Sequence, residues 1–195
     1  MISKTAVIGP HVQLGKNVVI EEFCVIGVSG PSDEKTIIGD HAIIRSHTVI
    51  YAGNHIGNYF QTGNKANIRE YNQIGHHVSV GTLSVIEHHV TIEDEVRIHS
   101  QAFISEYCYL KKKAWIGPQV VLTNAKYPQS ENVKKNLLGC VIHEEARIGA
   151  NSTLLPGVHI GEKTLVGAGS VVTHSVEAQL IVAGNPASLL RKGFY

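Results

Sequence analysis

Three ionisable residues and an asparagine recur at intervals of 18 residues along the middle of the chain: Glu70, His88, Glu106 and Asn124. A carboxylate beside a histidine can fix the tautomer of the imidazole and raise its basicity, and a general base needs both. If this spacing brings the side chains together, His88 is the candidate base, with Glu70 and Glu106 as its orienting carboxylates. A solvated edge on which charges merely alternate is the alternative interpretation.

The element that must position these residues is a six-residue repeat. An aliphatic residue occupies every sixth position from Ile38 to Leu122, with Thr62 as the one exception, and shorter runs cover residues 8–26 and 142–172. A period of six fits neither an amphipathic helix nor a plain strand. It fits a short strand followed by a tight turn, with one large and one small side chain pointing inward per unit. The repeat therefore predicts an all-β fold, a parallel β-helix.

This pattern resembles the left-handed parallel β-helix of the hexapeptide acyltransferases, in which three hexads close one triangular coil. The resemblance implies that positions 18 apart stack along the axis, about 4.8 Å from one coil to the next. It implies roughly seven to eight coils, and it places Glu70, His88, Glu106 and Asn124 in one column on one corner.

Two segments interrupt the repeat, and a third ends it. Residues 28–37 contain turn-forming residues and are expected to form an excursion that keeps the phase, whereas residues 128–141 are an insertion that shifts it. We expect a β-helix over residues 1–176 with a protruding loop at 128–141. Residues 177–195 should form a C-terminal cap, with a strand, a turn and a short helix. Long loops in compact repeats are usually functional, and this one begins just past Asn124, which favours a site at the column.

The composition excludes several classes of protein. Lys+Arg number 17 and Asp+Glu 16, so no basic excess indicates a nucleic-acid partner. The N-terminal residues contain no apolar run typical of a signal peptide or a membrane span. The three cysteines, Cys24, Cys108 and Cys140, are odd in number and far apart in the sequence, which is typical of free thiols in a reducing cytoplasm.

Three stretches go beyond a generic repeat, namely residues 62–75, residues 115–128, and residues 148–161 with their continuation through 166–173 and 182–187. Together they resemble the nucleotide-sugar N-acetyltransferases, which acetylate an amino group on a dTDP- or UDP-linked deoxysugar. The resemblance implies acetyl-CoA as cosubstrate, a nucleotide sugar as acceptor and a homotrimer with sites between chains. It implies sugar contacts by Asn64, Arg69, Glu70 and Asn124. In these enzymes His is frequent where this chain has Asn64, and "TND" often stands where this chain has Thr-Asn-Ala at 123–125.

The cofactor prediction also has a physical basis. Gly149-Ala150 and Gly167-Ala168 lie 18 residues apart, so they should stack as a bare surface of backbone. Such a surface lets an extended pantetheine arm pair its amides with free backbone groups. In the tail, a proline face at Pro186 suits an adenine ring, and Arg191 and Lys192 suit the CoA phosphates. Simple turn chemistry is the alternative explanation of the glycines.

Other stacked polar residues are interpreted differently. Asn54 and Asn72 are expected to hydrogen-bond along the sheet, and His76 with Asp94 is expected to be structural.

Twelve histidines raise the question of a metal. The γ-class carbonic anhydrases bind zinc through three histidines on this fold, and His41 and His77 lie two coils apart. Thr82 stands where the companion ligand would fall, so we expect no metal. The remaining alternatives are an O-acetyltransferase acting on a sugar or antibiotic hydroxyl, such a metal-dependent hydratase, and a β-helix without catalysis.

Overall fold

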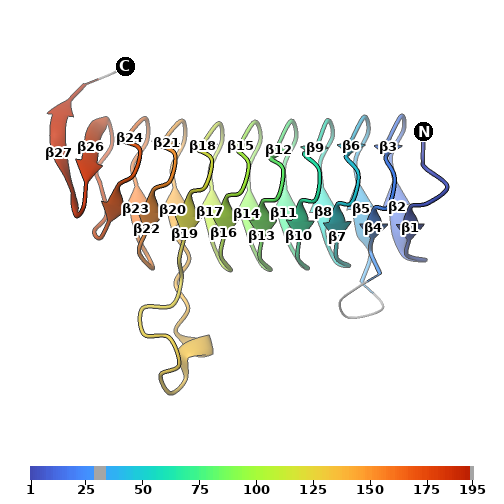
Figure 1. The fold of residues 1–195 in the computed structure, drawn as a ribbon, viewed down its shortest axis with the longest axis horizontal. Helices are drawn as coiled ribbons and strands as arrows, with labels where there is room; N and C mark the ends of the chain where they lie inside the picture. Colours follow the sequence, from blue (N-terminus) through green and yellow to red (C-terminus); the bar gives the residue numbers. More distant parts are fainter. Residues whose placement is uncertain (29–33, 194–195) are drawn as a thin grey trace.

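The chain winds into a left-handed parallel β-helix whose short strands form three sheets along its length (Figure 1). The computed structural model describes residues 1–28 and 34–193. The two termini lie at opposite ends of the helix, and one long loop projects from its side (Figure 1). The predicted fold class is therefore confirmed.

The chain passes through the three sheets in turn, so that every third strand of the β-helix belongs to the same sheet. Sheet I contains β1 (Val7–Ile8), β4 (Val25–Ile26), β7 (Val49–Ile50), β10 (Asn67–Ile68), β13 (Val85–Ile86), β16 (Phe103–Ile104), β19 (Val121–Leu122), β22 (Thr153–Leu154) and β25 (Val171–Val172). Sheet II contains β2 (Val12–Leu14), β5 (Thr36–Ile38), β8 (His55–Ile56), β11 (Gln73–Ile74), β14 (Thr91–Ile92), β17 (Tyr109–Leu110), β20 (Val141–Ile142) and β23 (His159–Ile160). Sheet III contains β3 (Val19–Ile20), β6 (Ile43–Ile44), β9 (Gln61–Thr62), β12 (Ser79–Val80), β15 (Arg97–Ile98), β18 (Trp115–Ile116), β21 (Arg147–Ile148), β24 (Leu165–Val166), β26 (Leu180–Gly184) and β27 (Ala187–Lys192).

Neighbouring strands pair in the register that the 18-residue spacing predicts. In sheet I, for example, Ile68 of β10 pairs with Ile86 of β13, which in turn pairs with Ile104 of β16. These three side chains point inward and are fully buried. The aliphatic residue of each hexad therefore supplies the core, because burying such a side chain contributes about 1.5–3 kcal/mol.

The corners between sheets contain a residue in the left-handed region, and most of these residues are not glycine. Tyr59 has φ 58° and His77 has φ 57°. This conformation costs an L-residue about 1–2 kcal/mol. These two residues donate their N–H groups to carbonyls of the preceding turn, Tyr59 to Asp40 and His77 to Asn58, both at 2.8 Å. The hydrogen bonds between turns offset the local cost and fix the corner geometry.

The β-helix has about ten turns, so the prediction of seven to eight is too low. Strand pairing continues past the hexapeptide motif at both ends, since Ile2 bridges to Ile20 and β26 pairs with β24. A count based on the motif alone omits these turns. Part of the predicted excursion at 28–37 falls on residues 29–33, which lie outside the described residues, and Thr36–Ile38 form β5 rather than loop.

The predicted loop lies between β19 and β20 and carries one short 3-10 helix, η1 (Val133–Lys135) (Figure 1). After the loop the chain re-enters the β-helix in phase, because Leu110 of β17 pairs with Ile142 of β20. The insertion therefore leaves the stacking of the turns intact.

The C-terminal cap is a β-hairpin, so the short helix predicted within residues 177–195 is wrong. Strand β26 extends sheet III, and β27 folds back on it in antiparallel pairing from Gly184 and Ala187 to Leu180 and Lys192. The open edge of β26 offers a row of hydrogen-bonding groups to the tail. A helix of so few residues has too little internal hydrogen bonding to compete.

Polar residues inside the β-helix are hydrogen-bonded. Asn54 and Asn72 are fully buried; Asn54 Oδ1 accepts from the Asn72 N–H at 3.0 Å, and Asn72 Oδ1 accepts from the Val90 N–H at 2.7 Å. The structural interpretation of this pair is confirmed. Thr62 stands in the aliphatic column, and its hydroxyl accepts from the Arg45 N–H at 2.9 Å.

Two of the three cysteines meet although they are 32 residues apart. The Cys140 N–H donates to Cys108 Sγ at 3.3 Å, because the inserted loop returns the chain to the next turn. Cys24 lies elsewhere in the core, and all three thiols are free.

The outer faces of the sheets differ in character. Sheet I presents a mainly apolar row that is half-buried: Val25, Val49, Val85, Phe103, Val121 and Val171. The corresponding row of sheet II is mostly polar, whereas that of sheet III mixes apolar residues with polar and charged ones. Sheet I is thus the face best suited to contact another protein surface.

Candidate functional site

The structure brings His88, Glu106 and Asn124 into contact at the corner between sheets I and II. These residues follow β13, β16 and β19, one turn apart. His88 Nε2 lies 3.6 Å from Glu106 Oε1, an ion-pair distance longer than a hydrogen bond. Asn124 Nδ2 donates to the other oxygen, Glu106 Oε2, at 2.6 Å. The Glu106 carboxylate is therefore held between an amide and an imidazole.

The other nitrogen of His88 faces a residue that the sequence reasoning missed. His88 Nδ1 lies 2.8 Å from Nδ1 of His89, so one of the two rings donates and the other accepts. If Glu106 favours the tautomer with the proton on His88 Nε2, then Nδ1 is the nitrogen that can accept a proton. His89 is already hydrogen-bonded to that nitrogen. A substrate amine must displace His89 or pass its proton through it.

Glu70 stands in the same column, but its carboxylate is turned toward Arg69. Arg69 donates to both oxygens of Glu70, at 2.8 and 3.0 Å, and lies 3.6 Å from a carboxylate oxygen of Glu87. Its guanidinium also lies over the Tyr51 ring at 4.9 Å. The hydrogen bonds from Arg69 hold the pKa of Glu70 below its usual value. Glu70 is thus committed to Arg69, whereas Glu106 is the carboxylate that faces His88.

Glu87 is a second carboxylate that the spacing argument missed. Burial raises the pKa of Glu87 above the usual value, although nearby Arg69 acts in the opposite direction. Glu87 stands directly before His88 in the sequence, which is the signal that could have identified it.

Aromatic rings surround the two histidines. The ring centroid of Tyr107 lies 5.8 Å from that of His88 and 5.7 Å from that of His89, and Tyr71 lies 5.2 Å from His89. Tyr71, His89 and Tyr107 form a column of their own, one residue after the Glu-His-Glu column. The same 18-residue spacing could have revealed it.

The inserted loop begins at this site. Asn124 is 8% exposed, and its carbonyl accepts from the Leu138 N–H at 2.9 Å, so it joins the two ends of the loop. The residue that orients Glu106 thus also anchors the loop. A change in the loop can therefore be transmitted to the carboxylate beside His88.

Asn64 lies at a different corner, between sheets III and I. Its side-chain amide donates to Ser46 Oγ at 2.8 Å and is exposed. Asn64 precedes β10 and Glu70 follows it, so the two residues lie at opposite ends of that strand. His88 follows β13 and lies at the same corner as Glu70, one turn further along. Within one chain Asn64 and His88 therefore do not line the same cavity.

The predicted cofactor surface stacks as expected at that same corner between sheets III and I. The Gly169 N–H donates to the Ala150 carbonyl at 2.8 Å, and a Cβ on Gly149 would lie 2.4 Å from Ala168 N. Only glycine fits this close approach of two backbones. A Cβ on Gly167 would lie 2.8 Å from the Cβ of Ala183 in β26, so the cap continues the same edge.

The tail residues predicted to contact CoA lie beyond this surface. Pro186 is exposed in the turn between β26 and β27, and Arg191 and Lys192 are exposed on β27. All three belong to the end of sheet III that contains Gly167. The structure therefore groups the predicted cofactor residues at one end of the molecule.

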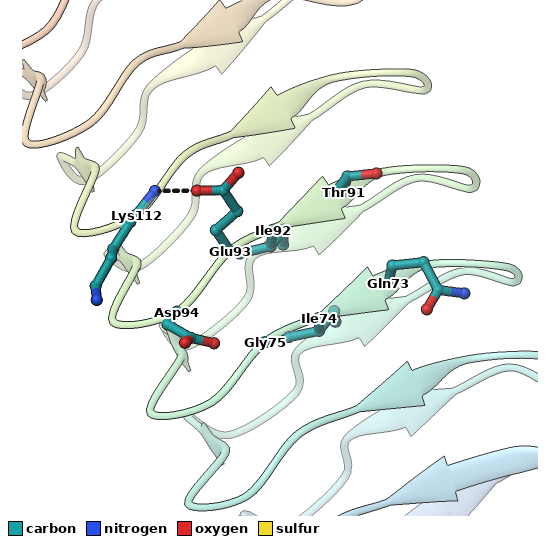
Figure 2. A pocket seen from close by; sticks show the side chains of 8 residues that line it. All are labelled: Gln73, Ile74, Gly75, Thr91, Ile92, Glu93, Asp94 and Lys112. Carbon is teal, nitrogen blue, oxygen red and sulfur yellow. Dashed lines mark hydrogen bonds between the residues drawn. The ribbon is translucent and has the colours of Figure 1, made fainter.

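A hollow of about 390 Å³ on sheet II has a different character (Figure 2). Figure 2 shows Glu93 reaching the backbone of Lys112, where its Oε2 accepts from the N–H at 2.8 Å, and its Oε1 accepts from the Tyr109 hydroxyl. Asp94 Oδ1 accepts from the His76 N–H at 2.7 Å, and His76 Nδ1 accepts from the Asn58 N–H at 2.9 Å. These side chains stabilise the turns, which agrees with the structural interpretation of His76 and Asp94.

His41 and His77, which were considered as zinc ligands, are separated by an aromatic ring. Tyr59 stacks between His41 and His77, with centroid distances of 4.8 and 4.6 Å and nearly parallel planes. Within residues 1–28 and 34–193, no group of three or more His, Cys, Asp or Glu side chains is placed to hold a metal ion. In the same described ranges, no helix has the length and apolar character needed to cross a membrane.

The sequence and the fold both match known proteins. Residues 139–174 match the family "Bacterial transferase hexapeptide (six repeats)". A 2,3,4,5-tetrahydropyridine-2,6-dicarboxylate N-acetyltransferase of Clostridium perfringens is 46% identical over 52 residues, which are 27% of this chain and 22% of that protein. A protein with the same activity from Staphylococcus aureus is 33% identical over 81 residues, which are 42% of this chain and 31% of that protein. The matches thus span less than a third of these relatives.

Solved structures show the same fold over nearly the whole chain. The Arabidopsis UDP-N-acetylglucosamine acyltransferase superposes with a TM-score of 0.60 at 18% identity, covering 98% of this chain and 74% of that one. The enzyme of that name from Campylobacter jejuni superposes with a TM-score of 0.56 at 19% identity, covering 98% and 75%. The chain thus contains a segment that matches the hexapeptide-repeat model, and it shares the overall fold of these solved structures.

Proposed function

We propose that the protein transfers an acetyl group from acetyl-CoA to the amino group of a nucleotide-linked deoxysugar. The observation that supports it most directly is the ordered row of His88, Glu106 and Asn124 at the base of the inserted loop. A hexapeptide-family match and relatives named as N-acetyltransferases support the reaction class. The acceptor class rests on the resemblance of residues 62–75 and 115–128 to nucleotide-sugar enzymes.

The proposed reaction is a direct transfer within one ternary complex. The amine nitrogen attacks the thioester carbonyl, and a tetrahedral oxyanion forms that a backbone N–H stabilises. His88 takes the amine proton, and Glu106 stabilises the resulting imidazolium. The C–S bond then breaks, and the CoA sulfur leaves as a thiolate that is protonated in turn. General-base catalysis of this kind contributes about 10²–10⁴-fold in rate.

Acetyl-CoA is proposed to lie along the backbone surface of Gly149, Ala150, Gly167 and Ala168. The glycines let successive turns approach closely, and the small side chains of Ala150 and Ala168 are proposed to give the pantetheine arm access to this edge. The exposed cations Arg191 and Lys192 lie where the CoA phosphates would extend, and Pro186 lies where the adenine would. No metal is proposed to take part.

A homotrimer is proposed to complete the site. Asn64 and His88 lie on corners flanking sheet I, so they can serve one acceptor only if two chains contribute. The apolar row of sheet I offers a surface for that association. A cytoplasmic location agrees with the reaction, since acetyl-CoA is an intracellular metabolite.

The test is a CoA-release assay on purified protein with a panel of acceptors. The panel contains dTDP- and UDP-linked amino sugars, the same sugars with a hydroxyl in place of the amine, and 2,3,4,5-tetrahydropyridine-2,6-dicarboxylate. Acetylation of an amino sugar with kcat/KM above about 10⁴ M⁻¹s⁻¹ supports the proposal. Acetylation of the hydroxyl sugars alone, or of the dicarboxylate alone, contradicts the acceptor. If none of these acceptors causes release of CoA, the result contradicts the proposed transferase activity itself.

A further inference from the structure

The outer face of sheet III carries a row of side chains that the proposed reaction does not use. Gln61, Ser79, Arg97, Trp115 and Arg147 are register partners in five successive turns. Arg97 and Arg147 are exposed, and between them stands the single tryptophan of the chain. An aromatic plane flanked by cations is the arrangement that binds an anionic ring compound.

Two hollows on sheet III are each lined in part by residues of this row. One, of about 280 Å³, is lined by Gln61, Ser79, Arg97 and His99, and its floor includes Gly63 and Gly81. The other, of about 450 Å³, is lined by Lys113, Trp115, Arg147 and Leu165. Both are open to solvent on the same face. Arg97 of the first hollow and Trp115 of the second are register partners on neighbouring strands, so one ligand can contact both side chains.

Arg97 is available for an anion. Its side chain forms neither a hydrogen bond nor an ion pair with any residue in 1–28 or 34–193. The nearest acidic residue along the chain, Glu95, lies 3.5 Å from the ammonium of Lys112 and is paired with it. An exposed guanidinium without a carboxylate partner is suited to bidentate binding of a phosphate.

His99 supports the indole from one side. The equivalent position is glycine in the two preceding turns, Gly63 and Gly81, and in the following turn, Gly117. The ring centroid of His99 lies 4.6 Å from that of Trp115. Burial, with a smaller contribution from Arg97, lowers the pKa of His99, which favours the neutral imidazole. Its Nε2 is buried and has no hydrogen-bond partner among the described residues.

We propose that the outer face of sheet III binds a nucleoside diphosphate, with the heterocyclic base against the Trp115 indole and the diphosphate against Arg97. Base stacking on an aromatic side chain supplies affinity for any base, and the cation supplies the requirement for phosphate. His99 holds the indole in place as a positioning residue. The inference does not depend on acetyl transfer.

Two molecules could supply this chemistry. The ADP portion of CoA is one source, because Gly149 and Gly167 directly follow β21 (Arg147–Ile148) and β24 (Leu165–Val166); CoA bound in this way would place its adenine at Trp115 and not at Pro186. The nucleotide of a nucleotide sugar is the other source. Both present a base and a diphosphate.

Trp115 itself reports on the site, since no other tryptophan contributes to the fluorescence. Purified full-length protein is titrated separately with UDP, dTDP, ADP and CoA, and with uridine as the ligand that lacks phosphate. The expected result is a saturable change in fluorescence with one or more of the diphosphates and a Kd for uridine at least about tenfold higher. Saturation by UDP or dTDP alone identifies the nucleotide sugar as the source, and saturation by CoA and ADP identifies CoA. No change with any diphosphate up to about 1 mM overturns the inference.

Substitutions distinguish binding at Arg97 and Trp115 from non-specific binding elsewhere on the surface. Arg97→Gln should raise the Kd about tenfold or more, because one charge-assisted contact is lost. Arg45→Gln is the matched control on the same sheet: Arg45 is paired with Glu21 at 2.5 Å, and its loss should leave the Kd unchanged. Trp115→Leu, followed by calorimetry, should abolish measurable binding while circular dichroism stays that of the parent. Parental affinity in Arg97→Gln or in Trp115→Leu overturns the inference.

Discussion

Replacing Asn124 with aspartate changes one group at the centre of the candidate site. Asn124 donates its amide to Glu106 at 2.6 Å, so Asn124→Asp replaces a donor by a second carboxylate. The lost hydrogen bond to a charged acceptor costs about 1.5–3 kcal/mol. Two unit charges at that distance repel by about 1.6 kcal/mol in bulk water and about 6 kcal/mol at an effective dielectric constant of 20. The Glu106 side chain is 24% exposed, so water screens the pair and the lower figure applies.

The folded state should therefore lose about 3–5 kcal/mol near pH 8, which corresponds to a fall in Tm of about 6–20 °C for a chain of this length. The repulsion raises the folded-state pKa of the carboxyl pair above the unfolded value. The folded state then binds more protons than the unfolded state, so the deficit shrinks as the pH falls toward about 4. Thermal unfolding followed by circular dichroism between about pH 5 and pH 8 measures both effects.

Asn58→Asp is the matched control for this substitution. Asn58 also lies at a corner, but its Oδ1 accepts from the Asp40 N–H at 2.8 Å, and aspartate offers the same acceptor. The control should keep its Tm within about 2 °C of the parent. Equal losses in the two variants, or a loss in Asn124→Asp that grows as the pH falls, would refute the reasoning about Glu106.

Three further outcomes are expected at other positions. His88→Ala and His88→Gln should each lower kcat by about 10²–10⁴-fold in the CoA-release assay, and a loss below about threefold in both would remove His88 as the base. Ala168→Phe should raise the Kd for CoA in calorimetry by filling the backbone surface; an unchanged Kd in the folded variant would place CoA elsewhere. Val85→Asp, on the apolar row of sheet I, should convert a trimer to monomers in light scattering, and a parent of 21.2 kDa that is monomeric and fully active would contradict the trimer.

The period of six was sufficient to predict the stacking of the turns. Inward aliphatic residues fix the register, because a shift of one residue would expose the whole buried row. The residues of the corner column and of the glycine edge are then found by adding 18 to a residue number, or 32 where the loop lies between the two turns. This addition alone places His88, Glu106 and Asn124 in one column.

The directions of the side chains could not be obtained by the same addition. Glu70 occupies the column position, yet its carboxylate faces Arg69 because a guanidinium forms two hydrogen bonds with it. His89 points back to His88 because its left-handed backbone turns the ring toward the same corner. Such choices depend on competition among neighbours that a one-dimensional period does not contain. Strand β27 was predicted as a helix for a related reason, since the free edge of β26 with which it pairs exists only after the last turn has formed.

The re-entry of the chain in phase at Ile142 has a consequence for how this molecule can change over evolutionary time. The β-helix on both sides of the loop is held by contacts between adjacent turns, so the loop adds no constraint on the register. The segment can be lengthened, shortened or exchanged for another without repacking a single core residue. Preference for the acceptor could then diversify by replacement of this loop alone, while the β-helix and the proposed acetyl-CoA surface stay constant.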